Sequence, residues 1–297
     1  MRIRKCLYGF ICLVLQFFYS NDCFAQKSPS FHFYNITTED GLSSNLINDI
    51  TQDSLGYIWI ATNDGLNRYD GNNFKVFKSG NPYYHISNNY VQNITIVGNK
   101  LYIGTDGGLN IYDIKYESIE LFDTRYSDIL GNSISALHKR PDANILDIGI
   151  YRAGLQHLDL NQNSFHKAPA INKYLSSKEV SSIIQRDGYL YVGTFDDGLN
   201  QIDLKTNTLK ADYLKLGAIN TTYLDRKDNI WIGTRNGIVI ITKDNTILRI
   251  EQGINSAGGL SDNDVLCFQE DHNGYMWVGT RNGGINLIKM DNLQKEQ

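Results

Sequence analysis

The chain has 297 residues, of which 41% are hydrophobic, and a formal net charge of −4. A chain of this length can bury a large core without disulfides or metal ions. Its basic residues form no run beyond the N-terminal signal, so nucleic-acid binding, which depends on clustered positive charge, is not expected.

The first 25 residues have the pattern of a secretory signal peptide. MRIRK is basic, CLYGFICLVLQFFY is apolar, and Cys23-Phe24-Ala25 offers small residues for cleavage. An uncleaved anchor is the alternative, but the apolar run is shorter than the roughly 20 residues of a spanning helix. We therefore expect residues 26–297 to be exported to the periplasm as one soluble domain, without membrane insertion. The signal would remove three of the four cysteines, and Cys267 in VLCFQE is expected to be a buried small hydrophobe.

One short apolar run recurs six times in the remaining chain. It reads IWIAT, LYIGT, LDIGI, LYVGT, IWIGT and MWVGT, and a small residue stands at the same place in each copy. The small residues are Ala61, Gly104, Gly149, Gly193, Gly233 and Gly279. Their spacing of 40 to 46 residues is typical of propeller blades and too long for most helical repeats.

Each period contains the parts of a four-stranded antiparallel sheet. A partly alternating segment such as LINDITQD is followed by a turn rich in Asp, Asn and Gly, then by the apolar run. A turn ending in Gly, a third strand such as LNRYD and a more polar strand such as FKVFK complete the unit. The sequence therefore predicts an all-β fold, a β-propeller of four-stranded antiparallel blades, with no helix. The six repeats span about 41–80, 81–124, 125–168, 169–212, 213–251 and 252–290.

The second strand of each predicted blade carries information about packing. It is almost continuously apolar, as a strand buried on both faces is, and its small residue would let neighbouring blades approach closely. Trp59, Trp231 and Trp277 occupy one position in this strand, which indicates blade core; an exposed platform for stacking sugars is the alternative.

Closure of the ring has two interpretations. FHFYNI at 31–36 looks like a strand, and the last repeat lacks its fourth strand, so pairing of the two would close six blades and remove an exposed edge. A seven-bladed ring truncated by one blade would give the same pattern.

Catalytic and metal-binding motifs are missing from the sequence. None of the six histidines has a metal spacing, and neither a nucleophile elbow nor a P-loop occurs. Turns such as DHNG at 271–274 resemble the start of a calcium loop but lack its other ligands, which favours plain turn chemistry. We expect no catalytic residues, no metal and no cofactor.

Two stretches resemble the two-component regulator propeller repeat. They are GLSSNLINDITQDSLGYIWIATNDGLNRYDG at 41–71 and GGLSDNDVLCFQEDHNGYMWVGTRNGGINLI at 258–288, while LDIGIYRAGLQHLD at 146–159 departs by lacking the Trp and the Thr. The resemblance covers about 31–290. It implies a periplasmic sensor region of Bacteroidetes hybrid two-component histidine kinases, which detects glycan breakdown products. It also implies a second propeller, an immunoglobulin-like module, a membrane helix and a kinase, and we expect the second propeller, the membrane helix and the kinase to be absent from this chain.

The residues that vary between repeats are the candidates for binding. Propeller geometry places the six turns after the apolar runs on one face, around the axis, together with the connections between blades, of which GNPYYHISNN at 80–89 is the longest. Arg suits carboxylate or sulfate, and aromatic rings stack on sugar faces. The predicted ligand-binding residues are Asn63, Asp64, Tyr83, Tyr84, His85, Asp106, Tyr151, Arg152, Phe195, Asp196, Arg235 and Arg281.

Three functions fit this pattern, in order of preference. The first is a non-enzymatic sensory or binding module with an oligosaccharide ligand. The second is a structural platform that mediates a homodimer or contacts a second propeller or immunoglobulin-like domain, with the variable turns merely solvated or docked. The third is a propeller lyase that acts on polysaccharide.

Overall fold

The computed structural model describes residues 35–81, 85–253 and 259–290. The chain divides into two units, and the second, Thr37–Gln297, contains every strand of the described residues. The expected signal peptide and residues 31–34 of the expected closing strand lie outside the described residues, while Asn35 and Ile36 are not in a strand. Within the described residues, no helix combines the length and the hydropathy needed to cross a membrane.

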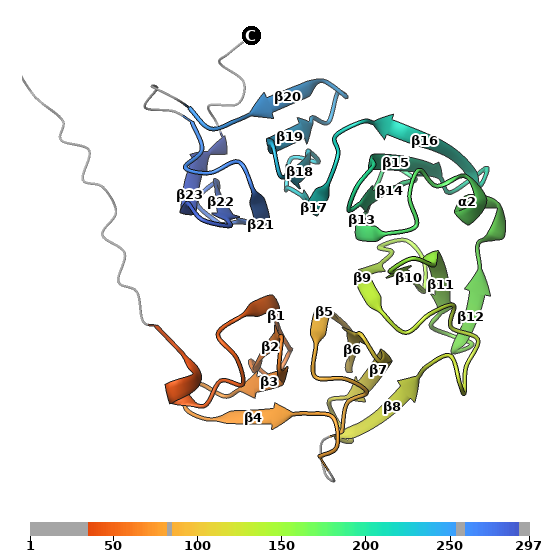
Figure 1. The fold of residues 1–297 in the computed structure, drawn as a ribbon, viewed down its shortest axis with the longest axis vertical. Coiled ribbons are helices and arrows are strands. Elements are labelled where there is room, and N and C mark those ends of the chain that lie inside the picture. Colours follow the sequence, from red (N-terminus) through yellow and green to blue (C-terminus); the bar gives the residue numbers. More distant parts are fainter. Residues whose placement is uncertain (1–34, 82–84, 254–258, 291–297) are drawn as a thin grey trace, which may run out of the picture. The chain divides into compact units, whose positions relative to one another are not determined.

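The second unit is a six-bladed β-propeller (Figure 1), which confirms the predicted fold class. Blade 1 contains β1 (Ile47–Gln52), β2 (Ile58–Thr62), β3 (Gly65–Tyr69) and β4 (Phe74–Phe77). Blade 2 contains β5 (Val91–Val97), β6 (Lys100–Thr105), β7 (Gly108–Asp113) and β8 (Ser118–Phe122). Blade 3 contains β9 (Ile134–Lys139), β10 (Ile145–Ile150), β11 (Gly154–Asp159) and β12 (Ser164–Lys167).

The second half repeats this plan. Blade 4 contains β13 (Val180–Arg186), β14 (Tyr189–Thr194), β15 (Gly198–Asp203) and β16 (Thr208–Leu214). Blade 5 contains β17 (Ile219–Leu224), β18 (Ile230–Thr234), β19 (Gly237–Ile241) and β20 (Ile247–Ile250). Blade 6 has three described strands, β21 (Val265–Glu270), β22 (Tyr275–Thr280) and β23 (Gly284–Lys289). All pairings within blades are antiparallel between consecutive strands, so each blade is a meander.

The repeated Asp and Trp form one local unit. In blade 1 the Asp53 carboxylate accepts the backbone N–H groups of Leu55 and Tyr57 at 3.0 Å and the Trp59 indole N–H at 2.8 Å. Asp225 with Trp231, and Asp271 with Trp277, repeat the contact at 2.8 and 3.0 Å. The carboxylates thus fix the tight turns and the indoles together, which agrees with the turn chemistry expected of these residues.

Neighbouring blades bury a continuous apolar layer between them. Trp59 is fully buried and lies against Tyr112 of the next blade, with ring centroids 5.2 Å apart. A Cβ added to Gly149 would come within 2.6 Å of the Val180 side chain of blade 4, so the small residue is needed for the close approach. Trp231 is also fully buried, whereas Trp277 is half-buried.

One face of blade 1 and one face of blade 6 are more exposed than the corresponding faces of the other blades. Ile47 and Ile50 of β1 are 41% and 57% exposed, although Val91 and Ile94, their counterparts in β5, are buried. Ile285 of β23 is 63% exposed, while its counterpart Leu66 is buried. Each inner strand packs against the next from β1 to β21, but β21 and β1 do not pack in this way, and they lie apart in Figure 1.

Cys267 corrects one expectation, because it is exposed and not a buried hydrophobe. It lies on β21 and lines a cavity among the inner strands, which is described below. An innermost strand presents alternate residues to the axis, so an apolar-looking run there does not guarantee burial.

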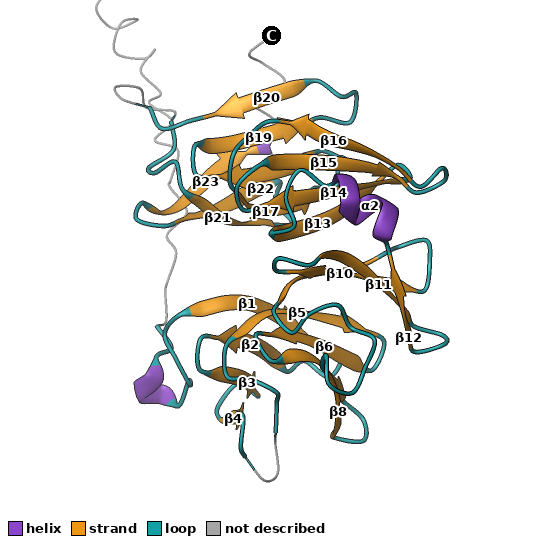
Figure 2. Ribbon diagram, turned by 45° about the vertical axis from the view of Figure 1, so that its right-hand side comes forward, coloured by secondary structure: helices purple, strands orange, loops and turns teal. Residues whose placement is uncertain are grey.

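Two short helices also depart from the expectation of an all-strand chain. They are a 3₁₀ turn at Thr38–Asp40 and the six-residue helix α2 at Pro169–Tyr174, which lies beside blades 3 and 4 in Figure 2. Pro169 suits the first turn, and Asn172 accepts the Leu155 N–H and donates to the Leu155 carbonyl, both at 2.8 Å. A helix this short has no recognisable hydrophobic periodicity, because it spans fewer than two turns.

Candidate ligand site along the propeller axis

The hairpin turns after each second strand lie beside the chain that enters the blade. The N–H of Asn63 donates to the Leu46 carbonyl at 3.2 Å, and those of Asp106 and Phe195 donate to Tyr90 and Glu179 at 3.3 and 2.9 Å. These bonds are possible because the second strand runs back antiparallel to the first. The turns and the connections therefore share one end of the propeller.

A cavity of about 730 Å³ opens at this end. Three of the predicted residues line it, namely Asn63, Phe195 and Arg281. The rest of its wall comes from connections and inner strands, with Asn45, Leu46, Ile47, Asn48, Tyr90, Asn220 and Leu266.

A second cavity, of about 440 Å³, lies among the inner strands. Residues of β1, β5, β9, β13, β17 and β21 line it, so all six blades contribute. The two cavities have Asn48, Tyr90, Phe195, Asn220 and Leu266 in common. We call their combined wall the axial site.

The axial site contains polar atoms with no hydrogen-bond partner in the described part of the chain. They are Asn93 Oδ1, Ser181 Oγ, Ser182 Oγ and Thr222 Oγ1, and all four are buried. Leaving a buried polar group unpaired costs about 1–3 kcal/mol. The four atoms have almost no accessible surface in this conformation, so a ligand or water molecule in the cavity can complete their hydrogen bonds only after the side chains turn toward it.

Asp49 is the acidic group in the wall of the inner cavity. Burial raises the pKa of its carboxyl group to about 6, although the N–H groups of Ile94 and Ile50 donate to the carboxylate at 2.9 and 2.8 Å and oppose the rise. At neutral pH it is an acceptor of hydrogen bonds, and near pH 6 it becomes able to donate.

Several predicted residues are already occupied by contacts within the protein. Asp64 pairs with Lys78 at 2.6 Å, Arg152 with Glu179 at 3.2 Å and Arg281 with Asp264 at 2.5 Å. Asp106 accepts hydrogen bonds from Gln92 at 2.6 Å and from Ser133 at 2.7 Å. These four side chains therefore already have polar partners within the protein.

The remaining predicted residues are scattered. Tyr83 and Tyr84 lie outside the described residues, and His85 accepts the Gly80 N–H within its own loop at 2.9 Å. Tyr151 meets Phe195 edge to face at 6.2 Å, without lining either cavity. Asp196 and Arg235 are exposed and also outside the cavity walls.

Sequence reasoning missed the polar residues of the inner strands. Asn48, Asn93 and Asn220 each donate to a carbonyl of the next blade, that of Val91, Ile134 or Val265, at 2.7 to 3.1 Å. A signal for them existed, because a polar residue follows closely after the first apolar residue of most inner strands. No cluster of His, Cys, Asp and Glu among the described residues is arranged to hold a metal ion.

Comparison with known proteins identifies the repeat. The model of the two component regulator propeller family matches residues 41–64 and 259–282. A curated relative, histidine kinase P4 of Formosa agariphila, is 39% identical over 71 residues, which are 24% of this chain and 5% of that protein. The chain thus spans a small part of this kinase.

Solved structures share the fold at low sequence identity. The extracellular domain of a hybrid two component system candidate from B. thetaiotaomicron, BT3049, has a TM-score of 0.61 at 24% identity, over 86% of this chain and 41% of that one. The extracellular domain of BT4673 from the same organism has a TM-score of 0.72 at 21% identity, over 88% and 38% of the two chains. PorZ, a surface component of the type-IX secretion system of Porphyromonas gingivalis, has a TM-score of 0.62 at 16% identity, over 82% and 38%.

The family match falls on the first and last of the six units that fold as blades. The predicted repeat is thereby confirmed in these two blades, where residues 41–64 and 259–282 match the two component regulator propeller model.

Proposed function

We propose that this chain is a sensory module of a two-component signalling system, exported to the periplasm, that binds an oligosaccharide from glycan breakdown at the axial site. The repeat family, the likeness to extracellular domains of such systems and the N-terminal signal pattern support this proposal. The role is binding without catalysis.

One observation carries the choice of ligand. Among the described residues, the wall of the inner cavity is rich in hydroxyl and amide groups, and Asp49 is the one charged residue in it. A neutral sugar offers many hydroxyl groups that donate and accept, so it can pair with such groups. The one cationic side chain among the described residues of the axial site is Arg281 at the outer cavity, and it is paired with Asp264, which disfavours a strongly anionic ligand.

Calorimetry with a panel of neutral and acidic oligosaccharides tests the proposal. Binding by the wild type should weaken about tenfold in Ser182→Ala and in Thr222→Val, because each removes one hydrogen bond to the ligand. Ser118→Ala, at an exposed position of β8, is the matched control and should bind normally. If no saccharide binds, or if all three variants bind as the wild type does, the proposal fails.

A second candidate function rests on the exposed apolar faces of blades 1 and 6. Ile50 and Ile285 are 57% and 63% exposed there, which is unusual for residues whose counterparts fill interblade layers. These faces would suit a second copy of the chain or a neighbouring domain. Sedimentation of the wild type and of Ile50→Lys distinguishes the two functions. If the chain is an assembly platform, Ile50→Lys should lose the assembly, whereas saccharide binding at the axial site should stay intact.

A further inference from the structure

Blade 3 breaks the pattern of the second strands at one position. Two residues before the small residue, five blades carry an aromatic side chain, but blade 3 carries Asp147. The aromatic residues are Trp59, Tyr102, Tyr191, Trp231 and Trp277. Asp147 is smaller than any of them, and it is completely buried.

A cluster of ionisable groups surrounds Asp147. Arg140 donates to both carboxylate oxygens, from Nε at 2.8 Å and from Nη2 at 2.7 Å, and His157 Nδ1 lies 2.6 Å from Oδ1. Burial would raise the pKa of Asp147, but the contacts with His157 and Arg140 outweigh it and hold that pKa below its usual value. The carboxyl group is therefore ionised at neutral pH.

The ionised carboxylate fixes the state of the His157 ring. Asp147 and His157 are directly opposite each other on β10 and β11, so their side chains share one face of the blade. An ionised Asp147 can only accept, so the short contact places a ring proton on Nδ1. In the neutral ring Nε2 is then an acceptor, and it has no partner among the described residues.

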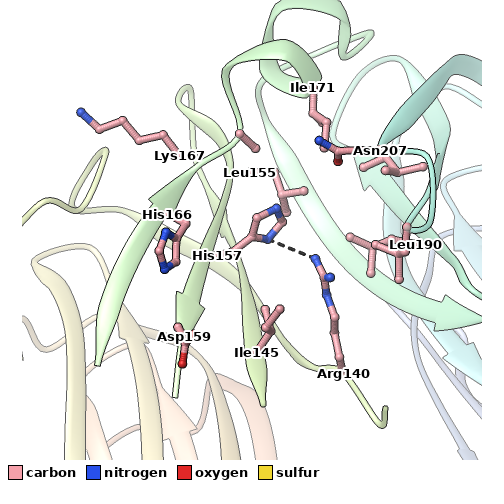
Figure 3. A pocket seen from close by; sticks show the side chains of 13 residues that line it. Arg140, Ile145, Leu155, His157, Asp159, His166, Lys167, Ile171, Leu190 and Asn207 are labelled. Atoms are coloured by element: carbon pink, nitrogen blue, oxygen red, sulfur yellow. Dashed lines mark hydrogen bonds between the residues drawn. The ribbon is translucent and has the colours of Figure 1, made fainter. Parts of the chain in front are cut away.

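A cavity of about 220 Å³ lies where the aromatic side chain would otherwise reach, between blades 3 and 4 (Figure 3). Arg140 and His157 line it from blade 3, and Leu190, Ile202 and Leu204 form the opposite wall. Asp147 is not on its surface, because Arg140 and His157 cover the carboxylate. At about 30 Å³ per water molecule, the volume corresponds to roughly seven waters, so it suits a small molecule and not a polymer.

The groups that face this cavity define the chemistry of an occupant. Arg140 Nη1 has no partner in the described part of the chain and can donate to a carboxylate, while His157 Nε2 can accept from a hydroxyl group. The aliphatic wall suits a carbon skeleton. From this arrangement we infer that the cavity between blades 3 and 4 is a second binding site, separate from the axial site, for a small hydroxycarboxylate such as a sugar acid.

Titration with glucuronate, followed by calorimetry and by the histidine ring resonances, tests this inference. Glucuronate should bind more tightly than glucose, which lacks the carboxylate, and than propionate, which lacks the hydroxyl groups. His157→Gln keeps an N–H for Asp147 but removes the free ring nitrogen, so it should weaken binding about tenfold. His272→Gln, the same change on an exposed turn of blade 6, should have no effect.

A cavity-filling variant tests whether glucuronate binds in this cavity and not elsewhere on the protein. Leu204 is only partly buried, so Leu204→Trp should block the cavity while circular dichroism still shows a folded propeller. Glucuronate binding should then be lost. The inference is overturned if glucuronate does not bind at millimolar concentration, if glucose or propionate binds equally well, or if binding survives in Leu204→Trp.

Discussion

The interface between blades 1 and 2 and the interface between blades 3 and 4 solve the same packing problem differently. In the first, Trp59 fills the layer and contacts Phe77 and Tyr112, with ring centroids 5.5 and 5.2 Å away. In the second, Asp147 takes the equivalent position and is held by Arg140 and His157. The first layer is apolar, whereas the second combines apolar residues with this ionic cluster and retains a cavity.

This difference shows that the repeat tolerates a change of chemistry where the backbone is unchanged. Asp147 pairs with His138 and His157 across the sheet in the register that Trp59 has with Thr51 and Arg68. The ladder of hydrogen bonds therefore sets the shape of a blade, while the side chain at this one position decides whether the layer is sealed or hollow.

The largest effect on stability is expected at the aromatic interface, which is the layer between blades 1 and 2. Trp59→Ala should lower the free energy of unfolding by about 3–5 kcal/mol, because a fully buried indole is lost and a cavity is left. Denaturation in urea measures the change. Trp277→Ala is the comparison, and it should cost clearly less because Trp277 is only half-buried; equal losses would contradict the role of burial in the effect of Trp59.

Breaking the ionic interface from one side should be nearly as costly. Arg140→Met leaves Asp147 buried without its guanidinium partner, and we expect a loss of about 3 kcal/mol. Arg235→Met, at an exposed turn, should change the stability little. If the two variants were equally stable in urea, the ion pair would have no structural role.

The ionic interface should also show a dependence on pH that the aromatic one lacks. Because the folded pKa of Asp147 lies below its unfolded value, its contribution is present above about pH 4 and is lost as the pH falls through the folded pKa. The stability gap between wild type and Asp147→Asn should therefore shrink on acidification. Urea titrations from neutral pH downward measure it, and a constant gap would refute the pKa shift.

Replacing both partners should have the smallest effect. Arg140→Met combined with Asp147→Leu removes the charges together and leaves apolar side chains, so the stability should stay within about 1 kcal/mol of the wild type. The same urea titration decides this. A loss as large as that of Arg140→Met alone would mean that the charges themselves, and not their mutual compensation, hold the layer together.

Much of the fold could be predicted because it depends on local and periodic features. The recurring run IWIAT, the turns with Asp53 and Asp225, and the glycine at each hairpin determine strands and turns through nearby contacts. The helix α2 could not be predicted, since its six residues are ordered by Asn172 bonding to Leu155 on another strand.

The candidate sites were less predictable than the fold. Of the residues proposed from the sequence, Asn63, Phe195 and Arg281 line the axial site. It also proposed Arg152 and Asp64, which pair with Glu179 and Lys78 instead. Which variable residue is free depends on partners contributed by other parts of the chain, and a repeat alignment does not contain them.

The sequence by itself thus determined the number of repeats, the order of strands and the apolar side chains that fill most layers between blades, because hydrophobic period and turn chemistry act within each unit. Only the tertiary structure decided which of these layers keeps a cavity. It brings Asp147 against Arg140 and His157, opposes them with the aliphatic wall of blade 4, and collects Ser181, Ser182 and Thr222 at the axis. Such sites arise between units, where packing joins residues that the chain keeps far apart.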